Sequence, residues 1–454
     1  MIAKPARVFV SSSRGDDSNT GLTEQDPLKT IKTALQVKAD TIKLKCGDTF
    51  YESSRFFDSS IDKYGEGPRP IMSGFRRIQD VKWEEVKMNV WRLNLSKGGF
   101  SGYQVEGSSY LNNIGCFHEY DKDIIHGNRV EYQYQLNNDW DFWQCDGHSK
   151  DLPASAFDFV YLYLTSDPNC LKLEVSVNEC GAIMYGYSVN GIHLEGFNTG
   201  INIFIKGNVT NCRIDAMGGN LFLTNSNEFV GAGNGIQLWV GNHSIKGSVV
   251  AGNFITRCYD CGITIQGSGD DGLSPHDVLI RDNLIQNCCQ GWEDFLSNDK
   301  SYYDNCVFTE NIVVNSGNSG FGYPPGRFKF CHIVQNNNRG LKGMQFIDNL
   351  FIGGNFFCAS DYKGSYKSSK WSGNVCYISS GNYMMGSYAG VRDVIWIPRK
   401  KFLESNESSG INSALQTYRD KTGDTSTVFH IVSLSSIQRR ASRTVKKYLK
   451  THHY

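Results

Sequence analysis

One short phrase recurs along residues 191–383, and it constrains the fold more than any other feature of the chain. The phrase begins with alternating apolar and polar residues, followed by an Asn and by a Cys or another small residue. A Gly then opens a second stretch of alternating residues. The Asn positions lie 30, 28, 38 and 25 residues apart and the Gly positions 27, 29 and 29 apart; they are Asn253, Asn283, Asn311, Asn349 and Asn374, and Gly235, Gly262, Gly291 and Gly320. Repetition with such a period is typical of a solenoid, in which each repeat buries its apolar face against its neighbours. Because the repeats alternate with a period of two and end at Gly, Asn or Asp, the sequence predicts a parallel β-helix.

The period of two separates side chains that point into the coil from those that point out. In three successive repeats the expected outward residues form two rows, Gln237, Thr264 and Glu293 in the first and Trp239, Gln266 and Phe295 in the second. The same register turns Trp292 and Asp294 inward. Because an unpaired carboxylate among apolar side chains is costly, we expect a β-bulge at Asp294 that turns it outward. The repeated Asn residues are expected to be structural, stacked on one another and bonded to turn backbone.

Charge and hydropathy exclude some partners. The 454 residues include 46 basic and 46 acidic side chains, so neither nucleic acid nor a membrane surface is an expected partner. No stretch is long and apolar enough to span a membrane, and the N-terminus has no hydrophobic signal region. We therefore expect a cytoplasmic protein, or a secreted or periplasmic one if a signal peptide has been removed. The sequence does not set the oligomeric state.

The 14 cysteines raise the alternatives of disulfides or a metal site. Most stand beside turn residues of the repeats, where a β-helix uses small apolar side chains. Cys258 and Cys261 form a CxxC, but no second pair follows at zinc spacing. We expect the cysteines to pack in the core, and we expect no metal site and no cofactor.

The N-terminal segment is predicted to form a cap on the solenoid. Residues 6–52 combine an alternating strand, a Gly-Asp-Asp-Ser-Asn turn, a helix from about Leu28 to Val37 with Pro27 at its start, and a strand at 41–44. A short amphipathic helix can cover the open apolar end of a solenoid. The segment resembles the N-terminal cap of the pectate-lyase-like right-handed β-helix superfamily, which includes polysaccharide lyases and glycoside hydrolases. The matching residues are Gly15 to Asn19, Gly21, Pro27, Thr30, Ile31, Ala34, Thr41, Ile42 and Gly47 to Tyr51.

The resemblance implies an all-β chain folded as a right-handed parallel β-helix, and the residues divide it into four parts. These are the cap and first coils (1–74), a β-rich insertion (75–180), the main coils (181–390) and a C-terminal extension with helices (391–454). The insertion is dense in aromatic residues, lacks the Asn-Gly rhythm, and resembles one found in β-helix glycoside hydrolases. In the extension, one helix is expected to end at Gly423. A second, over 434–450, carries six Lys or Arg and no acid from Ile437 on. It is either a solvated helix or a contact for glycan, phosphate or membrane surface.

Polar clusters on consecutive repeats are the candidates for chemistry, because each coil lies about 5 Å from the next. Glycoside hydrolysis needs two carboxyls, and the catalytic candidates are Glu293, Asp294 and Asp271. Aromatic side chains offer platforms for sugar rings, and Arg or His can hold an anionic group. The candidate substrate-binding residues are Gln237, Trp239, His243, Asp270, His276, Glu310, Tyr323 and Arg327.

The sequence thus predicts a carbohydrate-active enzyme, a glycoside hydrolase acting on a polysaccharide or oligosaccharide. A polysaccharide lyase would instead need a Lys, His or Tyr base with an Arg or Ca²⁺ at the uronate, and Lys300, Tyr323 and Arg327 could serve. No dense basic row accompanies them, so the acidic clusters favour hydrolysis. A non-catalytic glycan-binding β-helix would keep the aromatics without a carboxyl pair, and an epimerase would resemble a lyase. The carboxyl arrangement in the folded coils discriminates among these.

Overall fold

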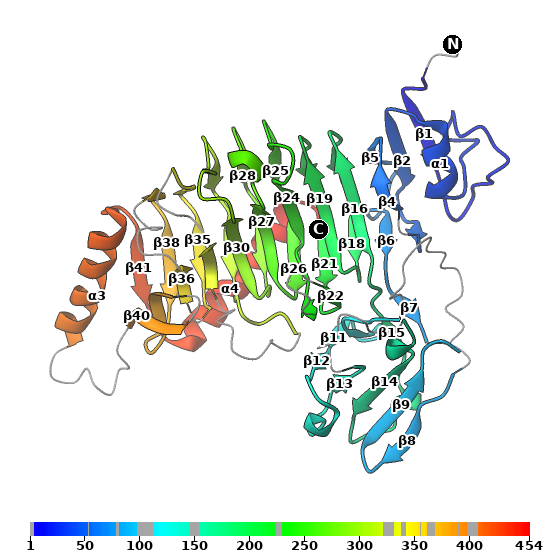
Figure 1. Ribbon diagram of the computed structural model, residues 1–454. Helices are drawn as coiled ribbons and strands as arrows, with labels where there is room; N and C mark the ends of the chain where they lie inside the picture. The colour runs from blue at the N-terminus through cyan, green and yellow to red at the C-terminus, as the bar shows by residue number, and fades with distance from the viewer. Residues whose placement is uncertain are drawn as a thin grey trace.

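Three long parallel sheets wind around one apolar core, which confirms the predicted parallel β-helix (Figure 1). The computed structural model describes residues 4–52, 54–78, 81–97, 112–145, 154–223, 229–320, 331–336, 342–354, 356–360, 368–387, 390–396 and 407–454. We call the sheets A, B and C in the order in which each coil visits them. In the central coils β25 (Val249–Ala251), β26 (Phe254–Cys258) and β27 (Cys261–Gly267) enter sheets A, B and C in turn. The next coil repeats the circuit with β28 (Leu279–Arg281), β29 (Leu284–Gln286) and β30 (Gln290–Leu296).

Each of these sheets contains ten strands within the described residues. Sheet A consists of β1 (Arg7–Val10), β2 (Thr41–Lys45), β5 (Ser60–Tyr64), β17 (Val189–Asn190), β20 (Val209–Thr210), β25 (Val249–Ala251), β28 (Leu279–Arg281), β31 (Val307–Thr309), β34 (Gln345–Ile347) and β37 (Lys370–Ser372). Sheet B consists of β3 (Thr49–Phe50), β6 (Ile71–Ser73), β18 (His193–Glu195), β21 (Arg213–Met217), β26 (Phe254–Cys258), β29 (Leu284–Gln286), β32 (Ile312–Val314), β35 (Leu350–Ile352), β38 (Val375–Ile378) and β41 (Val428–Ile431). Sheet C consists of β4 (Ser54–Phe57), β16 (Cys180–Tyr185), β19 (Thr199–Phe204), β24 (Ile236–Trp239), β27 (Cys261–Gly267), β30 (Gln290–Leu296), β33 (Cys331–Asn336), β36 (Phe356–Ser360), β39 (Tyr383–Ser387) and β40 (Gly390–Trp396), the last pair antiparallel.

The core is built from columns of inward side chains that repeat once per coil. In sheet C, Ile236, Ile263, Trp292 and Ile333 stand at one register and are fully buried. The corresponding column of sheet A becomes aromatic toward the C-terminal end, where Trp292 packs on Phe308 with ring centroids 5.1 Å apart. Fully burying one such side chain contributes about 1.5–3 kcal/mol, so the stacked columns are the main stabilising element of the solenoid.

The repeated Asn residues form a continuous buried ladder at the turns between sheets A and B. Each of Asn253, Asn283, Asn311 and Asn349 donates its side-chain amide to the Oδ1 atom of the next Asn, at 2.8, 2.8, 3.2 and 3.0 Å, and Asn374 ends the row. Each backbone N–H donates to the same Oδ1 atom at 3.0–3.1 Å. All five are at most 1% exposed. The predicted structural role of these residues is confirmed.

Three of the four repeated Gly residues, Gly235, Gly262 and Gly291, stand at the corners that lead into sheet C. The prediction for Gly320 is wrong, because β33 begins at Cys331 and places His332 in register with Gly291. A Cβ atom at Gly262 would lie 2.4 Å from Ile285 Cγ2, and one at Gly291 would lie 2.4 Å from Val313 Cγ1. Side chains of sheet B therefore fill the space that a larger residue would need. Close packing of one coil's corner on another explains the spacing of Gly235, Gly262 and Gly291.

A short helix covers the N-terminal end of the coils. Helix α1 (Ile31–Val37) buries Ile31 and Ala34 and is capped by Thr30, whose Oγ1 accepts from the Thr33 N–H at 3.1 Å. The carboxylate of Glu52 accepts from the N–H groups of Ile31 and Lys32 at 3.1 and 3.0 Å. The predicted start at Leu28 is wrong, because Leu28 forms a β-bridge with Val10 and Thr30 is the cap.

The β-rich insertion forms two small sheets beside the first coils, below them in Figure 1. One sheet has the order β11 (Ile124–His126), β10 (Phe117–Glu119), β15 (Leu173–Val175) and β7 (Arg76–Arg77). The other has the order β12 (Asn128–Arg129), β13 (Asp141–Trp143), β14 (Phe159–Tyr163), β9 (Val90–Asn94) and β8 (Glu84–Lys87), and 3₁₀ turns lie at Gln133–Gln135, Ala154–Phe157 and Pro168–Cys170. Phe117, Phe142 and Val160 are fully buried in a core of their own. A hairpin of β22 (Leu221–Leu223) and β23 (Phe229–Gly231) emerges from the solenoid next to Asn113.

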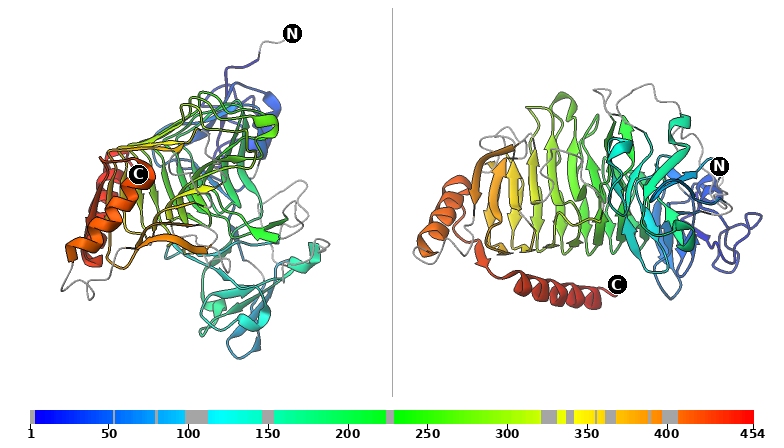
Figure 2. Two further views of the ribbon diagram at one scale, coloured as in Figure 1. Left: turned by 60° about the vertical axis from the view of Figure 1, so that its left-hand side comes forward. Right: turned by 90° about the horizontal axis from the view of Figure 1, so that it is seen from below.

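Two helices follow the coils. Helix α3 (Glu407–Thr422) ends at Gly423, which has φ +73°, as the sequence predicts. Its Tyr418 is buried and packs on Phe429 of β41, so the helix covers the C-terminal end of the core. Helix α4 (Leu434–Thr451) then runs back along the solenoid (Figure 2). Within the described residues no helix is both long and apolar enough to cross a membrane.

The prediction of a solvated C-terminal helix is only half correct, because α4 has one fully engaged face. Ile437, Ala441 and Tyr448 pack on outward apolar residues of sheet B, such as Leu284 and Ile352. The Tyr448 hydroxyl donates to the carbonyl oxygen of Asp282 at 2.7 Å. The helix thus ties together coils that are distant in sequence.

The cysteines are core residues, as expected. All 14 are free thiols, and all but Cys170 and Cys180 are buried. Cys258 lies in the apolar cluster of the coils, where burial raises the pKa of its thiol well above the usual value.

We predict that Asn311→Ala destabilises the fold strongly, by about 3 kcal/mol or more, because it leaves several buried ladder partners unsatisfied. The matched control is Asn242→Ala, at an exposed turn, for which a change within about 0.5 kcal/mol is expected. Thermal unfolding followed by circular dichroism measures both. Equal unfolding temperatures for the two variants would show that the ladder does not hold the coils together.

Candidate functional site

The outer face of sheet C carries the two rows that the sequence predicts. Gln237 of β24 pairs in register with Thr264 of β27, which pairs with Glu293 of β30. Trp239 likewise pairs with Gln266, and Gln266 with Phe295. The register therefore confirms both rows, and the polar and aromatic side chains of three coils stand next to one another.

The aromatic row extends beyond the predicted residues toward the N-terminal coils. Phe204 stands at the end of β19, one residue past the paired Ile203 and Leu238, which places it next to Trp239. Tyr185 pairs with Phe204, and their rings stack with centroids 4.7 Å apart. Tyr185 is 41% exposed, and Trp239 and Phe295 are partly exposed. The rings of Tyr185, Phe204 and Trp239 on successive strands form an apolar strip, and Gln266 separates this strip from the ring of Phe295.

Amide side chains connect the two rows through hydrogen bonds. Gln266 donates to Gln237 Oε1 at 3.0 Å, and Asn234 donates to the same oxygen at 2.8 Å. Asn202 is 5% exposed and Glu293 7%, while Thr264 is fully buried although it points away from the coil interior. The row is therefore a preorganised set of donors and acceptors, with one carboxyl among them.

The structure contradicts the bulge expected at Asp294. The ladder between β27 and β30 runs without a register shift from Ile263 to Gly267, and Asp294 pairs with Ile265 inside the coil. Asp294 is fully buried, and Gln335 Nε2 donates to its Oδ2 atom at 3.4 Å. Burial raises the pKa of Asp294 well above its usual value, so the carboxyl avoids the cost of a buried charge by keeping its proton. Asp294 does not share a face with Glu293.

Five other predicted residues lie at turns between the sheets. His243, Asp270, Asp271 and His276 come together on successive turns between sheets C and A, where Asp270 and Asp271 are exposed in a 3₁₀ turn (Asp270–Gly272). His276 Nδ1 lies 3.2 Å from Asp304 Oδ2, in a pair that links two turns. Glu310 is exposed at a turn between sheets A and B.

Asp271 therefore lies away from Glu293, because the chain runs about 10 Å along β27 from Thr264 to Gly267 before it turns. The structure does not bring the three predicted catalytic carboxyls together. Tyr323 and Arg327 lie outside the described residues.

A carboxyl that the sequence did not single out lies at the edge of this face. Asp260 precedes β27, and Gln290 Nε2 donates to its Oδ1 atom at 3.2 Å. Burial raises the pKa of the Cys261 thiol, and the charges of Glu293 and Asp260 raise it further, so both carboxyls lie near this thiol. The sequence contained a usable signal, which is the residue two positions before the repeated Gly. Asp260 stands there before Gly262, and Glu179 stands there before Gly181. The same position before Gly235 and Gly291 is not acidic.

A second charged cluster, also missed, joins the insertion to sheet B. Asp215 is held by Arg213 at 2.7 Å and by Arg257 at 2.6 Å, and Arg257 also bonds Asp123 of the insertion at 3.1 Å. Glu195 pairs in register with Asp215. Burial, and then the Asp215 charge, raise the pKa of Glu195 to about 7, whereas the arginines lower that of Asp215. Because Asp215 is only 1% exposed and both of its oxygens accept from arginine, we interpret the cluster as a structural joint.

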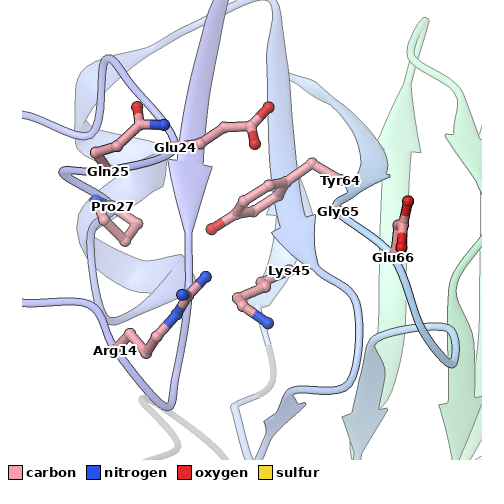
Figure 3. A pocket seen from close by; sticks show the side chains of 8 residues that line it. All are labelled: Arg14, Glu24, Gln25, Pro27, Lys45, Tyr64, Gly65 and Glu66. Atoms are coloured by element: carbon pink, nitrogen blue, oxygen red, sulfur yellow. The ribbon is translucent and has the colours of Figure 1, made fainter.

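A hollow of about 450 Å³ opens in the cap (Figure 3). Arg14 and Lys45 lie on one side of the Tyr64 ring and Glu24 on the other. Burial raises the pKa of Tyr64 to about 12. Lys45 and Tyr64 belong to strands of sheet A, so the hollow is separate from the face of sheet C.

Comparison with known proteins gives only distant likenesses. No protein-family model matches the chain, and no curated protein matches it. Among solved structures, a complex of XylC with xylose overlaps at a TM-score of 0.39 and 14% identity, covering 94% of this chain and 82% of the other. A GH136 lacto-N-biosidase from Eubacterium ramulus overlaps at 0.35 and 13%, covering 94% and 68%. Overlaps at this level do not establish a shared activity.

Asp294 leads to a prediction about pH. Its folded-state pKa is raised, so the folded protein keeps a proton that the unfolded chain loses above about pH 3.9. Stability should therefore fall as pH rises from that value toward the folded pKa, by up to about 1.4 kcal/mol per pH unit. Asp294→Asn should remove this contribution. The free energy of unfolding of the variant should therefore increase relative to that of the natural protein as pH rises from 4 to 8. Unfolding in denaturant across this range measures the difference, with exposed Asp271→Asn as control. Parallel curves for Asp294→Asn and the natural protein would contradict the assignment.

Proposed function

We propose that the protein is a carbohydrate-active enzyme, a glycoside hydrolase that binds a polysaccharide or oligosaccharide along the outer face of sheet C. One observation carries the proposal: an aromatic strip runs beside a row of hydrogen-bonded amides, and a carboxyl, Glu293, stands in that row. Aromatic rings stack on the apolar faces of sugars, and amides bond their hydroxyl groups. Because strands of a sheet lie 4.7–4.9 Å apart, the rings and amides of successive coils can meet successive parts of one glycan.

Glu293 and Asp260 are the proposed catalytic pair. Hydrolysis of a glycosidic bond needs one carboxyl that protonates the leaving oxygen and a second that activates water or attacks the sugar. Asp294 cannot serve because it points into the core, and Asp271 lies at the turn beyond β27. Asp260 precedes β27 at the edge of the same face, and its charge and that of Glu293 both act on the Cys261 thiol. The pair replaces the combination expected from the sequence.

Glu293→Gln and Asp260→Asn should each lower kcat by about 10²–10⁴, because each removes a proton donor or acceptor while keeping the side-chain shape. The KM is expected to change little. Release of reducing ends from a panel of neutral and acidic polysaccharides measures turnover, and exposed Glu66→Gln is the matched control. Unchanged turnover in the Glu293 variant would show that this face is not the site of catalysis. If the natural protein binds glycans but does not turn them over, the protein is a glycan-binding protein and not an enzyme.

Glu195 provides the most informative comparison, because its raised pKa and the ionised Asp215 beside it also form a pair of carboxyls with separated pKa values. Our assignment predicts that Glu195→Gln leaves kcat within about threefold, a change much smaller than the loss expected at a catalytic acid or base. If Glu195→Gln unfolds at the normal temperature but loses as much kcat as Glu293→Gln, the catalytic site lies at the junction of the insertion and sheet B.

Trp239→Ala should weaken glycan binding about 2- to 12-fold, which corresponds to the 0.5–1.5 kcal/mol typical of one aromatic contact. The measurement is calorimetric titration in the Glu293→Gln background, so that the glycan is not consumed. Tyr134→Ala is the matched control, because Tyr134 is an 81% exposed aromatic residue of the insertion. Equal affinities of the two variants would show that the aromatic strip does not contact the glycan.

A further inference from the structure

The exposed side of α4 borders a cavity of about 370 Å³ beside the C-terminal coils. Its walls come from residues 436–444 of the helix, from β38 and from the segment after β41. The helix turns its apolar residues toward sheet B, which leaves its cationic residues around this cavity and along the surface beyond it. The lining residues are Tyr377, Val432, Ser436, Arg439, Arg440, Arg443 and Thr444.

The lining is strongly cationic. Three arginines contribute to it and no acidic side chain does. Among the ion pairs of the described residues, none involves Arg439, Arg440 or Arg443. Lys446, Lys447 and Lys450 continue the positive charge for about 10 Å along the helix beyond Arg443. Like charges without a counterion repel one another, so the arrangement is stabilised when an anion binds.

Two of the three guanidinium groups are held in place. Arg440 lies over the Tyr377 ring at 3.9 Å, and Tyr377 stacks on His430 of β41 with centroids 4.5 Å apart. Arg439 Nη2 donates to Ser436 Oγ at 3.2 Å. A guanidinium that stacks by its flat face keeps its N–H edge available for an oxyanion. The side chains therefore lose less conformational entropy on binding than free arginines would.

The available donors fit a group with more than two oxygen acceptors. Three guanidinium forks and the hydroxyls of Ser436 and Thr444 surround the cavity. A carboxylate offers two oxygens, whereas a sulfate or phosphate ester offers three outward oxygens.

The way in which α4 packs on sheet B also indicates whether the sulfate or phosphate group belongs to a lipid or to a soluble molecule. A helix that binds a membrane surface inserts its apolar face between the lipids. The apolar face of α4 is already used, because Ile437, Ala441 and Tyr448 are buried against sheet B. A soluble polyanion needs only the exposed cationic face.

We propose that this cavity binds sulfate or phosphate ester groups of an anionic glycan, and that the lysines along α4 contact further charges of the same chain. The choice of a glycan as carrier rests on the proposed function, whereas the chemistry of the site does not. The site would hold a charged polysaccharide on sheet B while the neighbouring sheet C acts on it.

The test uses the full chain and calorimetric titration with dextran sulfate, unmodified dextran and vesicles of phosphatidylcholine with phosphatidylglycerol. The variant combines Arg439→Gln, Arg440→Gln and Arg443→Gln. Its matched control combines Lys82→Gln, Lys87→Gln and Lys97→Gln, which removes the same charge from exposed positions of the insertion. A third protein replaces the three arginines with lysine, which keeps the charge and removes the fork.

We expect dextran sulfate to bind the arginine-to-glutamine variant at least about tenfold more weakly, because the variant lacks the charge-assisted hydrogen bonds of three guanidinium groups. The insertion control should bind normally, the lysine protein should lose several-fold, and salt should weaken all binding. Equal binding by the glutamine variant and its control, or full affinity in the lysine protein, would overturn the proposal. If only the binding of vesicles, and not that of dextran sulfate, depends on the arginines, the proposal is overturned in favour of a lipid surface.

The two proposals can fail separately. Turnover of an uncharged oligosaccharide should be the same in the arginine variant as in the natural protein, because α4 lies on sheet B and Glu293 on sheet C. Arginine-dependent binding of dextran sulfate without any turnover would contradict the proposed function alone. Normal turnover without that binding would contradict this inference alone.

Discussion

The stacking of one coil on the next, in strict register, is the constraint on which the whole structure depends. A ladder of five asparagines illustrates it, because the Oδ1 atom of each Asn after the first accepts from both the backbone and the side-chain N–H groups of the Asn one coil earlier, with almost no exposure to solvent. Leaving such groups unpaired would be costly, so the ladder tolerates neither a slip nor a change of coil height. The apolar columns inside the coils require the same register. Every outward row on the three sheets is fixed by this requirement.

The outer surfaces of the solenoid differ according to what covers them. At the N-terminal coils, sheet B carries Glu195 and Asp215, and the insertion covers them with Asp123 and His118. Farther along, the same sheet presents apolar residues to α4. Sheet C presents amides and aromatic rings instead. A single repeating scaffold thus carries a structural joint, a docked helix and a candidate glycan-binding face, because outward positions are free of the demands of the core.

Asp294 shows how the demands of register exceed a local electrostatic cost. Moving it outward would need an extra residue in β30, which would displace Trp292 and Leu296 from the core column. The chain instead keeps the carboxyl inside, protonated and next to Gln335. Asp294 therefore does not share a face with Glu293, and Asp260, the partner that we propose for Glu293, precedes β27 of the adjacent coil.

The sequence by itself determined the β-helix, the positions of its turns and the direction of most strand side chains, because these follow from the period of two and from the spacing of Asn and Gly. It also located the outward rows through Gln237, Trp239 and Glu293 correctly. Only the tertiary structure decided which carboxyls share a face, because that depends on how far each strand runs before its turn and on what lies above it. Asp271 lies beyond the end of β27, Asp260 lies at its start, and α4 folds back over sheet B. Contacts between residues so far apart in the chain have no local signal, since they arise from packing between whole coils rather than from the pattern within one.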